Sequence, residues 1–162
     1  MAHSRKWLDR TLAVLVATLM AALVLDVLWQ VFTRFILRDP SSWTEELARY
    51  LMIWVGLIGA AYAAGRRMHL SVDLLSGALT GSRAHTLRIF IESLVLAFAL
   101  AALFAGGMRL VWVMLKLGQT SASLQIPLGY VYLAVPISGL LIAWYAILDL
   151  TDAVKGLRHG NN

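Results

Sequence analysis

The sequence contains no cysteine and only four histidines among its 162 residues. Without cysteine the chain cannot form disulfides, thiolate zinc sites or iron–sulfur clusters. All four histidines lie outside the apolar stretches, so none is placed to ligate a membrane haem. Histidine and carboxylate residues do not form a cluster with metal-ligand spacing. We therefore expect no metal site and no cofactor.

Charged residues are also scarce, at 14% of the chain, while 60% of the residues are hydrophobic. A soluble domain has about 25% charged and 45–50% apolar residues. A chain this short cannot hide so much apolar surface in its own interior, so lipid must cover the excess. The net charge of +5 comes from small basic groups rather than one block, which argues against a nucleic-acid partner.

Recognisable catalytic patterns are missing as well. The sequence has no Gly-rich phosphate loop and no nucleophile placed beside a base. We therefore assign no catalytic and no substrate-binding residues, and we expect that the protein is not an enzyme.

Four apolar runs dominate what is present. Each is close to the ~20 residues that a helix needs to cross a ~30 Å hydrocarbon core. They cover about 11–33, 46–64, 87–110 and 128–149. Alternating segments of ~10 residues, as in a membrane barrel, are not visible. The sequence predicts an all-α membrane protein with four transmembrane helices in a single domain, 1–162.

The basic residues predict the orientation of these helices. Of the 14 lysines and arginines, nine lie in the two termini and the second connection, against five on the other side. Because basic loops stay on the cytoplasmic side, we expect both termini in the cytoplasm.

The second connection is expected to contain a short amphipathic helix over about 68–80. Its apolar and polar faces follow helical spacing. These faces consist of Met68, Val72, Leu75 and Leu79, and of His69, Asp73, Ser76 and Thr80. The helix is too short to span, so we expect it to lie in the membrane interface, with Arg66 and Arg67 near the lipid head groups.

Charges inside the spans are the residues that most often mark function in a membrane protein. Asp26 and Arg34 lie on one face of the first span with Gln30 between them. They form either a local polar ladder or a protonatable site for ion coupling. In the third span, Glu92 follows Arg88 by one turn, which indicates an ion pair.

The second span begins with a polar cluster, Glu45, Glu46 and Arg49, preceded by Trp43. One interpretation is helix capping and pairing within the helix. The other is a contact with another helix or subunit at the outer interface. Trp54 either anchors the helix or packs against a neighbouring one. Further along, Gly56, Gly59, Ala60 and Ala63 form a small-residue face that favours helix packing.

These residues together resemble the small membrane subunit of tripartite ATP-independent periplasmic (TRAP) transporters, the DctQ-like or SiaQ-like family. Two ordered sets and one later segment carry the resemblance. They are Trp43, Glu45, Glu46, Arg49, Trp54 and Gly59, then Arg66, Arg67, His69 and Asp73, and the stretch from Gly118 to Pro136.

The resemblance implies a scaffold subunit in the bacterial inner membrane. The system would import an organic acid driven by sodium, through a large DctM-like or SiaM-like membrane subunit, with substrate delivered by a periplasmic binding protein. The interface with the large subunit or with the binding protein would then consist of Trp43, Glu45, Glu46, Arg49 and Trp54. Two alternatives remain at this point. One is a stand-alone four-helix proton-coupled exporter that uses Asp26, and the other is an assembly factor at the membrane surface.

Overall fold

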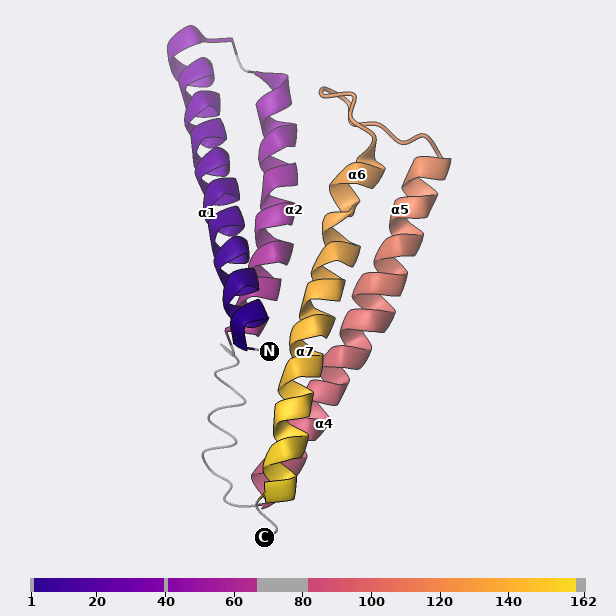
Figure 1. Cartoon of the computed structure of the whole chain (residues 1–162). Coiled ribbons are helices and arrows are strands. Elements are labelled where there is room, and N and C mark those ends of the chain that lie inside the picture. The colour runs from indigo at the N-terminus through magenta and orange to yellow at the C-terminus, as the bar shows by residue number, and fades with distance from the viewer. Residues whose placement is uncertain (1, 40, 67–81, 160–162) are drawn as a thin grey trace.

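The computed structural model describes residues 2–39, 41–66 and 82–159, and helices dominate it (Figure 1). The predicted interfacial helix over about 68–80, with Arg67, His69 and Asp73, lies outside the described residues.

Four long helical segments follow one another along the chain. The first is α1 (Ala2–Phe32) with its π-helical end η1 (Thr33–Leu37), and the second is α2 (Ser42–Gly65). The third consists of α4 (Ser82–Phe98), η2 (Ala99–Gly106) and α5 (Gly107–Lys116). The fourth consists of the short α6 (Leu128–Tyr132) and α7 (Ala134–His159). Each segment contains a helix long and apolar enough to cross a membrane, which confirms the predicted all-α fold with four spans.

The helix ends follow from local sequence. Pro127 directly precedes α6, and Pro136 lies in the first turn of α7, where a missing backbone N–H breaks no helical hydrogen bond. Arg38 ends η1 in the left-handed conformation, with φ of 54°. The Asp39 N–H then donates to the Thr33 carbonyl over 3.2 Å, which satisfies one of the free carbonyls at the helix end.

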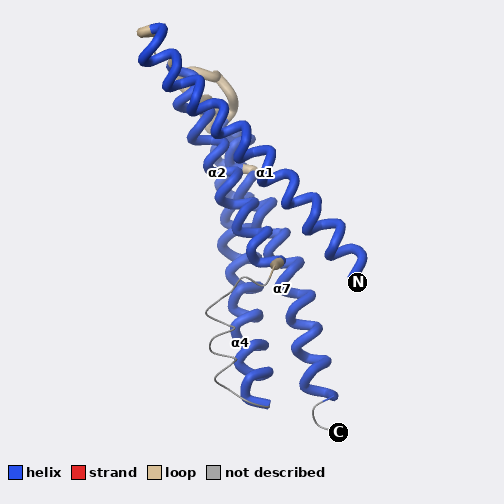
Figure 2. Tube along the Cα trace, turned by 90° about the vertical axis from the view of Figure 1, so that its left-hand side faces the viewer, coloured by secondary structure: helices blue, strands red, loops and turns tan. Residues whose placement is uncertain are grey.

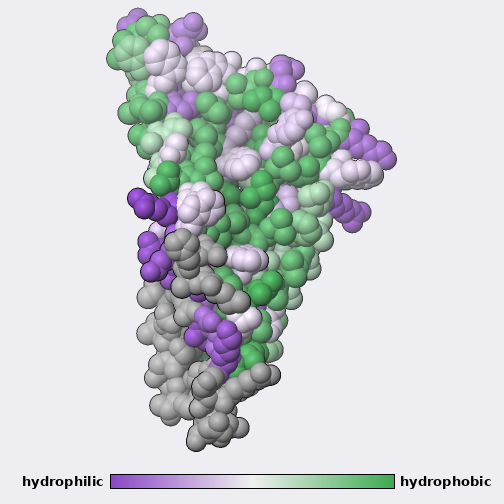
Figure 3. Space-filling view, viewed as in Figure 1, coloured by the Kyte–Doolittle hydropathy of each residue, from purple (hydrophilic) through white to green (hydrophobic). Residues whose placement is uncertain are grey.

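Along most of their length the described helices pack in a row rather than in a closed bundle, while at one end side chains of α1 also contact α7. α1 packs against α2, α2 packs against α7, and α7 packs against α4 and η2. Within the described part of the chain, α1 and α2 do not pack against the third helix. Within an apolar 18-residue stretch of each span, only 11% of the residues are therefore buried in the first three spans, against 44% in the fourth. Figure 3 shows hydrophobic residues over much of one broad face.

α1 meets α2 along a regular seam. Its buried and half-buried positions recur at alternating steps of four and three residues, which is the spacing of helices that pack at a shallow angle. These positions are Leu12, Val16, Leu19, Leu23, Asp26, Gln30 and Thr33. The span is 33 residues long, or about 50 Å, so it must tilt or extend beyond a ~30 Å core. Figure 2 shows α1 inclined to α4 and α7.

α7 approaches the third helix closely through two glycines. A Cβ on Gly139 would lie 2.8 Å from the Phe104 backbone nitrogen, and one on Gly107 would lie 2.9 Å from the Pro136 ring. Because no larger residue fits without a shift of backbone, these glycines set the spacing of the two helices.

Candidate functional site

One face of α2 has no neighbour within the described chain. Its exposed residues recur at steps of three and four: Glu45, Arg49, Met52, Gly56 and Ala60. No heavy atom of the described part lies within 4 Å of where a Cβ would stand on Gly56 or Gly59. We call these five exposed residues the open α2 face. The small residues Gly56 and Ala60 thus lie on one exposed face of α2, and no other helix of the described part packs on it.

A charged pair lies at the start of α2 on the open α2 face. The basic residues predict that this end faces the outer side of the membrane, and we refer to the two ends of the helices as outer and inner on that prediction. Arg49 Nη2 lies 3.4 Å from Glu45 Oε1, and the two side chains are 61% and 71% exposed. Such an exposed pair within one helix contributes little to stability. Its two charges therefore remain available to a partner at little cost to the fold.

Glu46, next in sequence, points to a different place. Its carboxylate accepts hydrogen bonds from three consecutive backbone N–H groups of the loop before α6. The donors are Ala122 at 2.9 Å, Ser123 at 3.0 Å and Leu124 at 3.1 Å. Successive N–H groups turned inward make an anion-binding concavity, here filled by the chain's own carboxylate. We call this contact the outer clasp, and it fixes the loop against α2.

Trp43 and Trp54 also lie in different environments. Trp43 is 42% exposed at the start of α2. Trp54 packs against the buried cluster of Leu12, Ile58 and Tyr145. Of the two readings of Trp54 that the sequence left open, the structure therefore supports packing within the chain.

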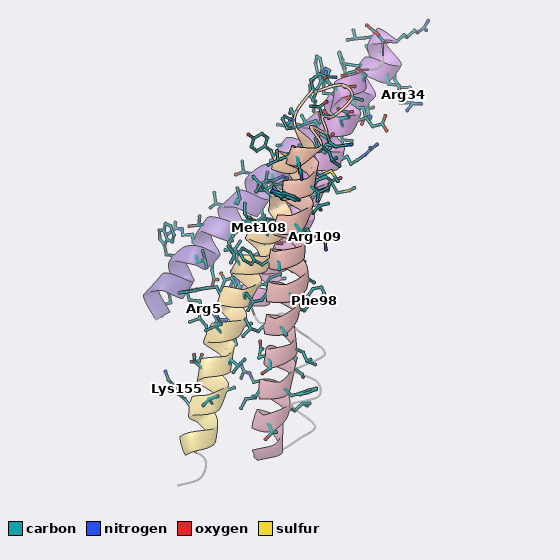
Figure 4. The ribbon with its side chains drawn as sticks, turned by 90° about the vertical axis from the view of Figure 1, so that its right-hand side faces the viewer. Arg5, Arg34, Phe98, Met108, Arg109 and Lys155 are labelled. Carbon is teal, nitrogen blue, oxygen red and sulfur yellow. The ribbon has the colours of Figure 1, made fainter. Side chains whose placement is uncertain are left out.

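At the opposite end, side chains from three helices meet around Tyr145. Arg5 Nη1 lies 3.1 Å from Asp149 Oδ1, and Arg5 Nη2 donates to the Gly65 carbonyl over 2.7 Å. The Tyr145 hydroxyl donates to Asp9 Oδ1 over 2.6 Å, and Tyr145 is 1% exposed. We call this cluster the inner junction, and it joins α1, α2 and α7. Figure 4 labels Arg5, near the N-terminal end of α1, and Arg34, at the far end of the first helical segment.

Sequence reasoning missed the inner junction. The available signal was the matching spacing of two polar pairs: Arg5 and Asp9 are one turn apart in the first helix, and Tyr145 and Asp149 one turn apart in the fourth. Facing pairs of that kind indicate contact between helices only when their depth in the membrane is known, and the depth of Arg5 does not follow from its sequence position.

Asp26 is buried in the seam between α1 and α2, at 8% exposure. Within the described residues its Oδ2 atom has no hydrogen-bond partner, and no salt bridge joins it to the exposed Arg34. The ladder interpretation therefore lacks its expected ion pair. In the antiparallel pairing that brings Leu12 to Ile58, Asp26 falls near the level of Thr44, which is fully buried.

The remaining predicted residues are placed as follows. Glu92 is buried on α4, at 8% exposure, and Arg88 is half-buried one turn before it. Arg66 follows α2, and its Nε donates to the Tyr62 hydroxyl over 2.9 Å. This hydrogen bond raises the pKa of Arg66 above its ordinary value, so its charge persists at any physiological pH.

Comparison with known proteins gives the family. The family model of the DctQ component of tripartite ATP-independent periplasmic transporters matches residues 23–156. The chain belongs to this family. The match begins within the first span and includes the open α2 face, the outer clasp and Tyr145. Membership does not favour the stand-alone exporter that Asp26 had suggested.

Three curated relatives place this DctQ-family chain more closely. It is 37% identical over 92 residues to the sialic acid TRAP transporter small permease protein SiaQ of Vibrio cholerae, covering 57% of this chain and 53% of the relative. It is 26% identical over 150 residues to a putative TRAP transporter small permease protein of Haemophilus influenzae, covering 91% and 90%.

The third relative is the isethionate TRAP transporter permease protein DctMQ of Oleidesulfovibrio alaskensis. The identity is 29% over 142 residues, covering 84% of this chain but only 22% of the relative. The chain thus spans about half the length of SiaQ and about a fifth of DctMQ.

Proposed function

We propose that this protein is the scaffold subunit of a sodium-driven TRAP transporter that takes up an organic acid. A periplasmic binding protein delivers the substrate, and a large membrane subunit carries it across the membrane. The present chain holds that large subunit in place. The chain lies in the bacterial inner membrane with both termini in the cytoplasm.

The open α2 face is the observation that supports this proposal most. Gly56 and Ala60 leave the α2 backbone accessible to a close helix neighbour, as small residues do at helix contacts within membranes. Glu45 and Arg49 add polar contacts at the outer end of the same face. A helix of the large subunit would fit this combination.

The relatives support the same partner and substrate class. The segment matching this chain forms about a fifth of the single permease protein DctMQ, so in that relative it is covalently part of a larger permease. Two of the three relatives described above are named for a substrate, sialic acid and isethionate, and both substrates are organic acids.

The loop held by the outer clasp supports a role in docking the binding protein. Residues 119–128 form a narrow hairpin-like turn, closed by Ser121 N–H to the Ile126 carbonyl and by Leu128 N–H to the Gln119 carbonyl. Glu46 ties the tip of this turn to α2, beside Glu45 and Arg49. A loop of fixed shape at the outer surface suits recognition of a soluble protein.

Co-purification of the large subunit tests the proposal with a matched pair of variants. Ala60→Leu places four carbons on the open α2 face, whereas Ala101→Leu makes the same change at an exposed position of η2. We expect Ala60→Leu to reduce recovery of the large subunit at least fivefold and Ala101→Leu to leave it unchanged. Equal recovery with both variants would overturn the assignment of this face.

Charge reversal at Arg49 is the second arm of the test. Arg49→Glu places two acids one turn apart at the outer end of the open α2 face, so we expect reduced co-purification or reduced uptake. Normal values of both would exclude a contact through Arg49.

A further inference from the structure

A second exposed feature lies on α1, on the side that faces away from α2. A hollow of about 430 Å³ runs along this side of the helix. It is lined by Trp7, Arg10, Thr11, Val14, Leu15 and Thr18. These residues lie opposite the seam of Leu12, Val16 and Leu19, so the packing of α1 on α2 leaves the hollow open.

Beyond Arg10, toward the C-terminal end of α1, the wall of the hollow is apolar. The Thr11 hydroxyl donates to the Trp7 carbonyl over 2.9 Å, and the Thr18 hydroxyl donates to the Val14 carbonyl over 2.8 Å. Because both hydroxyls bond their own helix, they are occupied and do not demand a polar ligand. Val14 is 61% exposed, so the wall presents hydrocarbon that only a lipid chain or an apolar protein surface would cover.

The end of the hollow nearest the N-terminus of α1 is positively charged. Arg10 lies one turn after Lys6, and within the described part of the chain neither makes a hydrogen bond or a salt bridge. Arg5, in contrast, is engaged with Asp149 and with the Gly65 carbonyl. Trp7, between Lys6 and Arg10 in the sequence, is 68% exposed. Tryptophan is enriched at the level of the lipid head groups, which suits this end of the hollow.

We propose that this hollow binds one anionic phospholipid. The phosphate lies against Lys6 and Arg10, and one acyl chain follows Val14, Leu15 and Thr18, so that the lipid covers about 12 Å of the helix from Arg10 to Thr18. Charge complementarity selects an anionic head group over a zwitterionic one. The site is separate from the open α2 face and does not depend on the proposed transporter role.

Native mass spectrometry of the purified full-length chain tests the binding. With equal amounts of phosphatidylglycerol and phosphatidylcholine, we expect the phosphatidylglycerol adducts to dominate. Arg10→Gln should reduce these adducts about fivefold, the ratio that corresponds to about 1 kcal/mol for one basic residue at a membrane surface. Arg34→Gln, at the far end of the first helical segment, is the matched control and should change nothing.

The position of the acyl chain needs a separate readout. Phospholipids with brominated chains quench nearby tryptophan, and the Trp7 share is the part of the quenching that Trp7→Phe removes. We expect that share to be larger for brominated phosphatidylglycerol than for brominated phosphatidylcholine. Equal quenching by the two lipids would overturn the proposal. Phosphatidylglycerol adducts unaffected by Arg10→Gln would also overturn it. If Arg10→Gln instead abolished co-purification of the large subunit, this side of α1 would be a protein contact.

Discussion

The inner junction and the outer clasp hold the same row of helices together in different ways. At the inner junction, side chains from α1, α2 and α7 meet around a tyrosine that is 1% exposed. At the outer clasp, one carboxylate of α2 holds three backbone N–H groups of an exposed loop. The first fixes the positions of helices relative to one another, and the second fixes the shape of a surface.

This difference separates stability from recognition. Changes at the inner junction leave buried polar groups unpaired or force buried atoms to overlap, and both carry a large cost. Backbone N–H groups carry no side-chain information, so the outer clasp holds the loop while leaving the exposed Ser123 side chain free to vary. We therefore expect variants of the inner junction to lower stability, and variants of the outer clasp to affect partner binding.

The largest effect is expected for Gly65→Leu. A Cβ at this position would overlap the ring of Tyr145, which has no room to move among three helices. Overpacking of this kind costs about 1–3 kcal/mol, and we expect the upper end because the Tyr145 ring is almost fully buried. Denaturant unfolding in detergent should show the loss, while Gly56→Leu, on the open α2 face, should unfold like the wild type.

Arg5→Gln should rank second. It removes the cation beside Asp149, whose side chain is 5% exposed, and it weakens the bond to the Gly65 carbonyl. Loss of one partner of a fully buried ion pair costs about 3–5 kcal/mol, and the 21% exposure of Arg5 reduces this to about 2 kcal/mol. The same unfolding measurement applies, with the exposed Arg34→Gln as control.

Tyr145→Phe should have a smaller effect on stability. The ring remains in place against Leu12 and Ile58, but Asp9 loses the hydroxyl that donates to it over 2.6 Å. We expect a loss of about 1 kcal/mol. If Tyr145→Phe unfolds as readily as Gly65→Leu, the hydrogen bond rather than the packing dominates the inner junction.

Glu46→Gln should leave the unfolding of the helices nearly unchanged. An amide oxygen accepts less strongly than a carboxylate, and the amide NH₂ would face backbone donors, so the loop should loosen. Limited proteolysis should cut within residues 119–127 several times faster than in the wild type. A glutamine variant cut at the wild-type rate would show that other contacts hold the loop.

The sequence predicted the features that depend on residues close together in the chain. The four spans and the small-residue face of the second span both follow from local spacing. The inner junction could not be predicted in this way, because Arg5 and Asp149 are 144 positions apart and meet only through the order of the helices in the row. From the sequence, Glu45 and Glu46 are assigned to one polar cluster. The loop at 118–127 shows the difference, because Glu46 binds its backbone N–H groups whereas Glu45 pairs with Arg49.

The absence of cysteine allows a direct measurement of the central claim, that a partner helix covers the open α2 face. A single spin label is placed through Ala60→Cys or, as the matched control, through Ala101→Cys, and collision with dissolved oxygen is measured in lipid bilayers. Adding the large subunit should lower the oxygen accessibility at residue 60 several-fold and leave residue 101 unchanged. Unchanged accessibility at residue 60, in a complex that still forms, would contradict the account.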